Sequence, residues 1–134
     1  MSLTHLQPDT LFPSARFGFT QVVTSPPGKL VFVAGQTALD RDFKAVGTDL
    51  GTQAEQAFTN LGHALEAAGA TFADVAHLRV FIANYKPEHA AALGPLMPRF
   101  FGDGPLPAQT LIGAQALAMP ELLIEIEAVA VVPD

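Results

Sequence analysis

The sequence predicts an α+β fold in which two helices cover one face of a mixed β-sheet. Three observations support this class. Residues 48–68 carry an apolar stripe with the period of an α-helix, residues 122–132 form an aliphatic run typical of a strand, and residues 87–101 form a second helical pattern interrupted by prolines. The predicted order of elements is β-β-α-β-α-β-β. The length of 134 residues fits one domain over residues 1–134.

The first two predicted strands lie close together in the chain. Residues 1–15 show no periodic pattern and are expected to be irregular. Residues 17–24 alternate loosely between apolar and polar side chains, and residues 30–34 form a short apolar run that predicts a buried strand. Residues 25–28 contain two prolines and a glycine, which favour a turn. Because the connection is so short, we expect the two strands to form a hairpin.

The clearest predicted element is the helix over residues 48–68. Its apolar side chains recur about every 3.6 residues, at Leu50, Ala54, Ala57, Phe58, Leu61, Ala64, Leu65 and Ala68. Thr52 and Glu55 have the spacing of a capping box near its start. Gly69 is a suitable residue just beyond its end, where a left-handed conformation commonly terminates a helix.

A third strand and a second helix follow. Residues 74–82 are rich in β-branched and apolar side chains and predict a strand. The helix predicted over residues 87–101 starts with a proline, which is tolerated in the first turn. Gly94, Pro95 and Pro98 then interrupt the pattern, so we expect a kink or a break there.

The last two predicted strands cover residues 108–112 and 122–132. The second is apolar at almost every position, which indicates a strand covered on both faces. Glu125 and Glu127 nevertheless lie two residues apart within it, so both side chains point to the same face. Each carboxylate needs a partner, a proton or a cleft. Since two helices cover only one face of the sheet, we expect the other face to require a second chain.

Composition excludes several functions. Charged residues make up 15% of the chain, against roughly 25% in an average domain, and apolar residues make up 49%. The net charge is −6 and the seven Lys and Arg residues are scattered, which argues against nucleic acid. The chain has no cysteine, and its histidines lack metal-ligand spacing, so we expect neither a metal nor a cofactor. No apolar run approaches the roughly 18 residues that span a membrane. The opening residues have no signal-peptide pattern, so we expect a cytoplasmic protein.

Several short strings, in this order along the chain, resemble the Rid family of reactive-intermediate deaminases, also called YjgF-like proteins. These strings are FTQ at 19–21, LVFVAGQ at 30–36, QAEQAFTNLGHALEAAGA at 53–70, VFIANY at 80–85, PAQT at 107–110 and IEIEAVAV at 124–131. The resemblance covers nearly the whole chain. It implies a chorismate-mutase-like α+β fold and a homotrimer whose sheets surround a central barrel, with ligand clefts between neighbouring subunits.

The resemblance also implies a site. Deaminases of this family hydrolyse enamines or imines such as 2-iminopropanoate, and an arginine in a Pro-Ala-Arg-Ser-like string holds the substrate carboxylate. This chain has Gln109 at that position, and an amide cannot give the bidentate, charge-assisted contact of a guanidinium. Phe19 stands where the family has a tyrosine, and Gly94 where it has an asparagine. Glu125 matches the acid that positions or activates the water, and Gly35 matches a glycine whose backbone lines the cleft.

Three functions are weighed on these residues. We expect a homotrimer whose inter-subunit cleft binds a small carbonyl- or imine-containing metabolite, with weak or absent activity on 2-iminopropanoate. The alternative is a hydrolytic enamine or imine deaminase that releases ammonia through Glu125 and a water, and the sequence leaves open whether the site is catalytic. The third is an RNA-acting protein, since relatives have carried a ribonuclease label, but the acidic charge disfavours it.

The remaining charged residues have competing interpretations. Glu127 is expected in a structural or interface ion pair rather than in catalysis. Arg79 either pairs with a glutamate of the sheet or turns into the cleft, and we favour the pairing. Arg99 is expected on the surface of the second helix. Gln109 either contacts a ligand or satisfies backbone groups, and the sequence does not separate these two roles.

Overall fold

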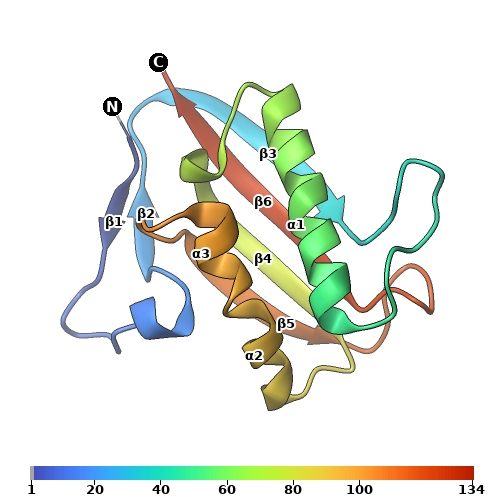
Figure 1. Ribbon diagram of the computed structural model, residues 1–134. Helices are drawn as coiled ribbons and strands as arrows, with labels where there is room; N and C mark the ends of the chain where they lie inside the picture. Colours follow the sequence, from blue (N-terminus) through green and yellow to red (C-terminus); the bar gives the residue numbers. More distant parts are fainter. Residues whose placement is uncertain (1) are drawn as a thin grey trace.

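A four-stranded mixed sheet forms the centre of the computed structural model, which describes residues 2–134. Its strand order is β3-β6-β4-β5, with bounds Gly28–Gln36, Ile124–Pro133, Val75–Ala83 and Ala108–Ala114 respectively. β6 runs antiparallel to both of its neighbours, whereas β4 and β5 are parallel. Figure 1 shows all the α-helices on one face of this sheet. The predicted α+β class is confirmed.

The long central helix α1 spans Leu50–Ala67 and packs on β3 and β6. Its N-cap is Asp49, whose carboxylate accepts a hydrogen bond from the backbone N–H of Thr52 at 2.8 Å. The predicted capping box of Thr52 and Glu55 is therefore wrong, because Thr52 already lies inside the first turn and donates its hydroxyl to Asp49. The helix ends as predicted, with Gly69 at a φ of +74°.

Gln53 joins the first turn of α1 to the segment that leads into β6. Its side chain is fully buried, and its Nε2 donates to the carbonyl oxygens of Gly47 at 3.1 Å and Glu121 at 2.8 Å. Its Oε1 accepts the backbone N–H of Leu123 at 2.8 Å. All three bonds are inside the protein, so this amide fixes the start of β6 relative to the helix.

The second helical region is broken at the glycine and proline, as predicted. A 3-10 turn at Pro87–His89 leads into α2 at Ala90–Leu93, and α3 follows at Leu96–Phe101. The ring of Phe100 stacks on that of Phe58 in α1, with 5.3 Å between the centroids. This contact holds α3 against the central helix.

The predicted hairpin between the first two strands is wrong. Residues 15–17 form a 3-10 helix, η1 (Ala15–Phe17), and only Val22–Thr24 is a strand, β2. β2 pairs with β1 (Thr4–Leu6), in a region expected to be irregular, while β3 pairs with β6. The two prolines between β2 and β3 remove N–H donors and fix φ, so the chain continues into the main sheet instead of reversing on itself.

The sheet has one face turned away from the helices, which we call the open face. Leu30 and Phe32 of β3 lie on it and are 59% and 73% exposed. The prediction that residues 30–34 are buried is therefore wrong for this face, since only Val31 and Val33 point into the core. The helices leave this second face uncovered, as expected, but the face is apolar only in part, because Arg79, Glu125 and Glu127 also lie on it. Among residues 2–134, no helix has the length and hydropathy needed to cross a membrane.

Candidate functional site

The residues predicted to form the site fall in two separate places. Gly94 and Gln109 line a cavity on the helix side of the sheet, whereas Gly35 and Glu125 lie on the open face. Phe19 lines neither place. Its ring packs edge-on against Phe12 with 6.1 Å between the centroids, and its carbonyl oxygen accepts a hydrogen bond from the buried Ser14 hydroxyl at 2.7 Å.

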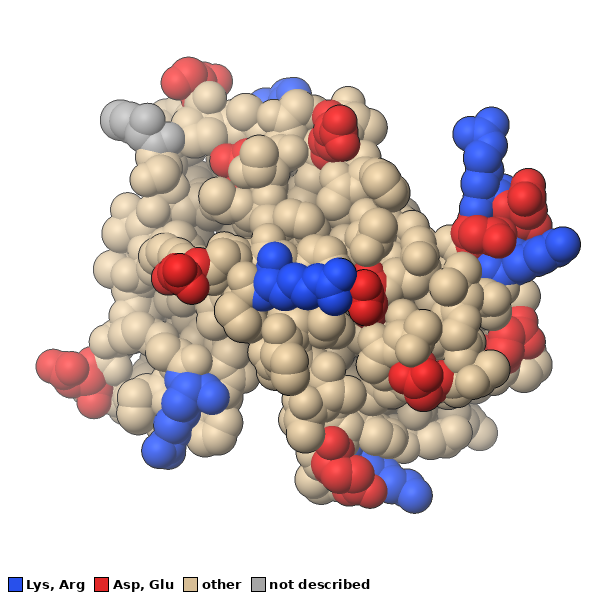
Figure 2. Space-filling model, viewed as in Figure 1, with Lys and Arg blue, Asp and Glu red and all other residues tan. Residues whose placement is uncertain are grey.

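The helix-side cavity lies between the N-terminal segment, the α2–α3 segment and the edge strand β5. Its volume is about 450 Å³, within the range of small-molecule sites. Its lining residues are Ala15, Arg16, Phe17, Gly18, Ala90, Ala91, Leu93, Gly94, Met97, Pro98, Leu106, Gln109 and Leu111. Figure 2 shows the surface hollowed between the N-terminal lobe and the lobe that carries α2. A Cβ atom at Gly94 would meet nothing within 4 Å, so the glycine leaves this wall recessed.

Gln109 is the uncharged polar side chain of this cavity. In β5 it is paired with Leu78 of β4, which points to the helices, so Gln109 also points to the helix side. Its Oε1 is buried and has no hydrogen-bond partner among residues 2–134. Buried polar atoms are nearly always satisfied, and leaving one unpaired costs about 1–3 kcal/mol. Gln109 therefore lines the cavity with an amide whose oxygen is buried and makes no hydrogen bond to the backbone.

Arg16 also lines the cavity, and sequence reasoning missed it. It belongs to η1, which ends at Gly18 with a φ of +90°. The Arg16 guanidinium lies 4.8 Å from the centroid of the Phe17 ring and makes no ion pair within residues 2–134. A three-residue helix leaves no periodic signal, so only the glycine after Phe17 hinted at a turn here.

Glu125 and Gly35 are in direct contact on the open face. A Cβ atom at Gly35 would lie 2.5 Å from Glu125 Oε2 and 2.6 Å from its Cδ, so only glycine leaves room for this carboxylate. Glu125 is two strands away from β5, because it pairs with Phe81, which in turn pairs with Ile112. Two strand spacings are roughly 9 to 10 Å. Glu125 and Gln109 therefore lie on opposite faces and do not share a cavity within one chain.

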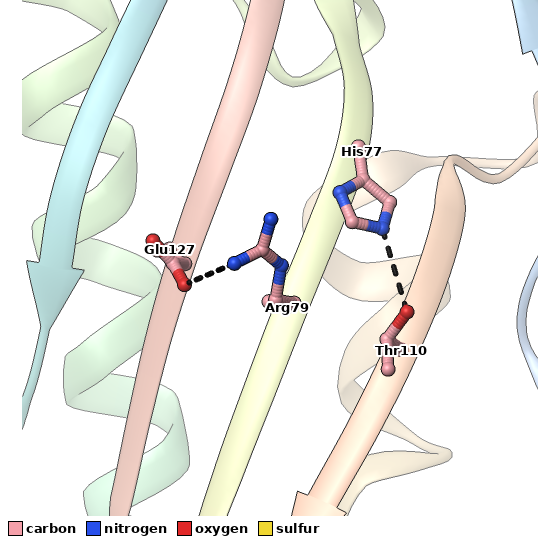
Figure 3. A network of polar contacts seen from close by, with 4 residues as sticks. All are labelled: His77, Arg79, Thr110 and Glu127. Atoms are coloured by element: carbon pink, nitrogen blue, oxygen red, sulfur yellow. Dashed lines mark hydrogen bonds and ion pairs between the residues drawn. The ribbon is translucent and has the colours of Figure 1, made fainter.

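The open face also carries the polar network in Figure 3. Arg79 Nη1 lies 3.2 Å from Glu127 Oε1, which confirms the expected structural pairing of both residues. His77 lies 3.5 Å from the hydroxyl of Thr110. Partial burial, reinforced by the positive charge of Arg79, lowers the pKa of His77 below 6.5, while Glu127 opposes this shift. The network therefore favours a neutral imidazole beside the ion pair.

The other charged candidates lie outside both places. Arg99 pairs with Glu55 of α1 at 2.8 Å on the protein surface, as expected for a helix-surface residue. Figure 2 shows basic and acidic side chains scattered over the face in view, without a basic patch. Within residues 2–134, no group of three or more His, Cys, Asp or Glu side chains is placed to hold a metal ion.

Comparison with known proteins gives matches along nearly the whole chain. The sequence model of the family described as Endoribonuclease L-PSP matches residues 10–132. A 2-iminobutanoate/2-iminopropanoate deaminase from Dermatophagoides farinae is 32% identical over 106 residues, which are 78% of this chain and 80% of that protein.

Solved structures agree in fold. YyfB from Yersinia pestis, a protein of unknown function of the conserved Rid protein family, is 41% identical with a TM-score of 0.94, over 98% of this chain and all of that one. Rv2704 from Mycobacterium tuberculosis, a member of the YjgF/YER057c/UK114 family, is 31% identical with a TM-score of 0.66, over 98% of this chain and 100% of that one.

Proposed function

This chain belongs to the Endoribonuclease L-PSP family of YjgF and Rid proteins, and on that premise we propose that it is a homotrimer whose inter-subunit clefts bind a small carbonyl- or imine-containing metabolite. One observation carries the proposal. The open face combines exposed apolar side chains with Glu125, a half-buried carboxylate held against Gly35. A face of this kind is stabilised when a second copy covers it.

The two halves of the candidate site support an inter-subunit cleft. The helix-side cavity opens beside β5, which is an outer strand of the sheet. Glu125 lies on the opposite face, so a single chain cannot bring it to Gln109. When the open face of one copy covers the β5 edge of its neighbour, Glu125 and Gly35 of the first copy meet the cavity of the second. In a closed ring of copies joined in this way, the open face of each copy is covered by a neighbour.

The alternative is a hydrolytic imine deaminase, favoured by the relative that carries this name and by the fixed position of Glu125. In that reaction the Glu125 carboxylate takes a proton from water while the water oxygen adds to the C=N carbon. The proton then passes to nitrogen and gives a carbinolamine. Glu125 next transfers the hydroxyl proton to the same nitrogen, the C–N bond breaks as the C=O bond forms, and a ketone or ketoacid and ammonia are released. General acid–base assistance of this kind contributes typically 10²–10⁴-fold. Gln109 supplies hydrogen bonds but no positive charge for a ketoacid imine, so we expect weak activity on 2-iminopropanoate.

The test measures ammonia release from 2-iminopropanoate generated in situ from alanine by an amino-acid oxidase, which oxidises the amine to the imine. We expect little acceleration by the wild-type protein, an increase with Gln109→Arg, and loss of that increase when Glu125→Gln is added. Strong acceleration by the wild type that disappears in Glu125→Gln would instead establish the hydrolytic alternative. A protein that stays monomeric at micromolar concentration would refute the inter-subunit cleft.

A further inference from the structure

We propose that the imidazole of His77 makes assembly through the open face sensitive to pH, so that the copies separate when this ring takes up a proton. The inference rests on the proposed function in one respect, since it takes the open face as the surface through which copies of the chain associate. The residues that carry it form the polar network of Figure 3, which the proposed ligand cleft does not use.

His77 lies in the same row of the sheet as Phe32, the most exposed large apolar side chain of the open face. Phe32 of β3 pairs with Val129 of β6, and Val129 pairs in turn with His77 of β4. The three side chains therefore stand in line across the open face, with His77 two strand spacings, roughly 9 to 10 Å, from Phe32. A second copy that covers this row covers the imidazole together with the apolar side chains.

One carboxylate lies beside the two basic side chains of this network. Arg79, two residues after His77 on β4, is paired with Glu127 of β6 at 3.2 Å. Glu125 is one pair of residues further from His77 along β6 than Glu127 is. On the other side of β4, Thr110 of β5 is uncharged, and β2, which also contacts β4, has no titratable side chain. A protonated His77 therefore places two positive charges beside one carboxylate that is already in an ion pair.

The single chain already favours the neutral ring. Partial burial and the positive charge of Arg79 lower the pKa of His77 below 6.5, against the opposing effect of Glu127. Covering the open face takes the ring further out of water, which disfavours its charged form still more. The imidazole therefore binds a proton less readily in the assembly than in the free chain. By linkage, assembly is strongest above the pKa of His77 in the free chain, and it weakens as the pH falls through that pKa, below 6.5.

Sedimentation velocity of the full chain at pH 7.5, 6.5 and 5.5, each over a dilution series, measures the association constant. This range lies above about pH 4, where carboxylates ordinarily titrate, so histidine is the side chain that changes its charge. Each copy contributes one His77, so the association constant of a trimer falls by up to about a thousandfold for each pH unit below the pKa of the free chain. We expect a decrease of at least about tenfold between pH 7.5 and pH 5.5. The same series with Phe32→Ala, whose assembly is expected to be weaker, keeps the constant within the measurable range.

Two substitutions of His77 fix its charge. His77→Gln keeps an uncharged side chain, and its association constant should be the same at all three pH values. His77→Lys is charged throughout this range and should assemble at pH 7.5 no more tightly than the wild type does at pH 5.5. His5→Gln is the matched control, because partial burial also lowers the pKa of His5, but His5 lies in β1, outside the four-stranded sheet. This control should keep the pH dependence of the wild type.

The outcomes separate this inference from the proposed assembly. An association constant that does not change with pH, or a pH dependence that survives in His77→Gln, overturns the role of His77 and leaves the assembly standing. Loss of the fold at pH 5.5, seen by circular dichroism, would assign the dissociation to unfolding and would also overturn that role. A chain that is monomeric at every pH refutes the proposed assembly, and the inference with it.

Discussion

Replacing Phe32 with alanine should weaken assembly without unfolding the chain. Phe32 lies on the open face and is 73% exposed in the single chain. Full burial of such a side chain contributes about 1.5–3 kcal/mol. About three quarters of that contribution, about 1.1–2.2 kcal/mol for each copy, is therefore lost when a second copy covers this face and the ring is absent. In the proposed trimer the loss occurs three times, which lowers the overall association constant by about two to five orders of magnitude.

Sedimentation velocity over a dilution series measures this constant. We expect the trimer of Phe32→Ala to dissociate at concentrations where the wild type remains assembled, while circular dichroism shows an unchanged fold. The wild-type trimer can be so stable that Phe32→Ala causes no dissociation in the measurable concentration range. In that case Phe32→Glu, which buries a charged carboxylate at the same position, should abolish assembly.

Phe43→Ala is the matched control. Phe43 is similarly exposed, at 67%, but it lies in the loop between β3 and α1 rather than on the open face. Its truncation should leave the association constant unchanged. If Phe32→Ala and Phe32→Glu both assemble as the wild type does, the open face is not the interface and the reasoning from its exposure is refuted.

Three further changes test the site and its support. In the Gln109→Arg background, Gly35→Ala should lower Glu125-dependent turnover about a hundredfold at an unchanged Tm, because the new Cβ displaces the carboxylate by around 1 Å. Equal turnover would show that the position of Glu125 is not critical. Gln53→Leu should cost about 3 kcal/mol in urea unfolding, since it removes three buried hydrogen bonds; a cost near zero would mean that water replaces them. Hydrogen bonds from Thr52 lower the pKa of Asp49 below its ordinary value of 3.8, so the ionised cap stabilises the fold above that pH and the effect is lost as the pH falls below it. The Tm difference between wild type and Asp49→Ala should therefore shrink from pH 7 to pH 3, and a difference independent of pH would contradict this origin.

The sequence was most informative where a pattern is local and periodic. The stripe over residues 48–68 predicted α1 to within two residues at each end, because every position of one helical face faces the same core. The spacing of Glu125 and Glu127 correctly predicted that both side chains lie on one face of β6, because side chains two residues apart in a strand point to the same side. Gly94 and Pro95 correctly predicted the break between α2 and α3, because a proline has no backbone N–H and interrupts the helical hydrogen bonds where it stands.

Pairing partners were harder to predict than elements. β1 and β2 have three residues each, too few for alternation to be visible, and their pairing joins segments separated by the whole η1 region. The hairpin expected from the short connection did not form, because β2 pairs with β1 and the edge of β3 that faces away from β6 has no partner strand in the sheet order. Which strands pair with each other depends on the whole folded sheet, so the sequence of one segment does not determine its partner.

The division of the candidate site between two faces explains why periodicity and spacing could not predict how its residues are arranged. Gln109 and Arg16 reach the helix-side cavity from β5 and η1, while Glu125 reaches the open face from β6, and none of the three is near another in sequence. Side chains on opposite faces of a sheet do not pack against each other. Substitutions among the residues that line the cavity therefore leave the contact between Glu125 and Gly35 unchanged. The carboxylate and its glycine can therefore be retained while the polar lining of the cavity changes. In the proposed cleft, the residues of the helix-side cavity would therefore select the ligand, and Glu125 of the neighbouring copy would supply the acid–base group independently of them.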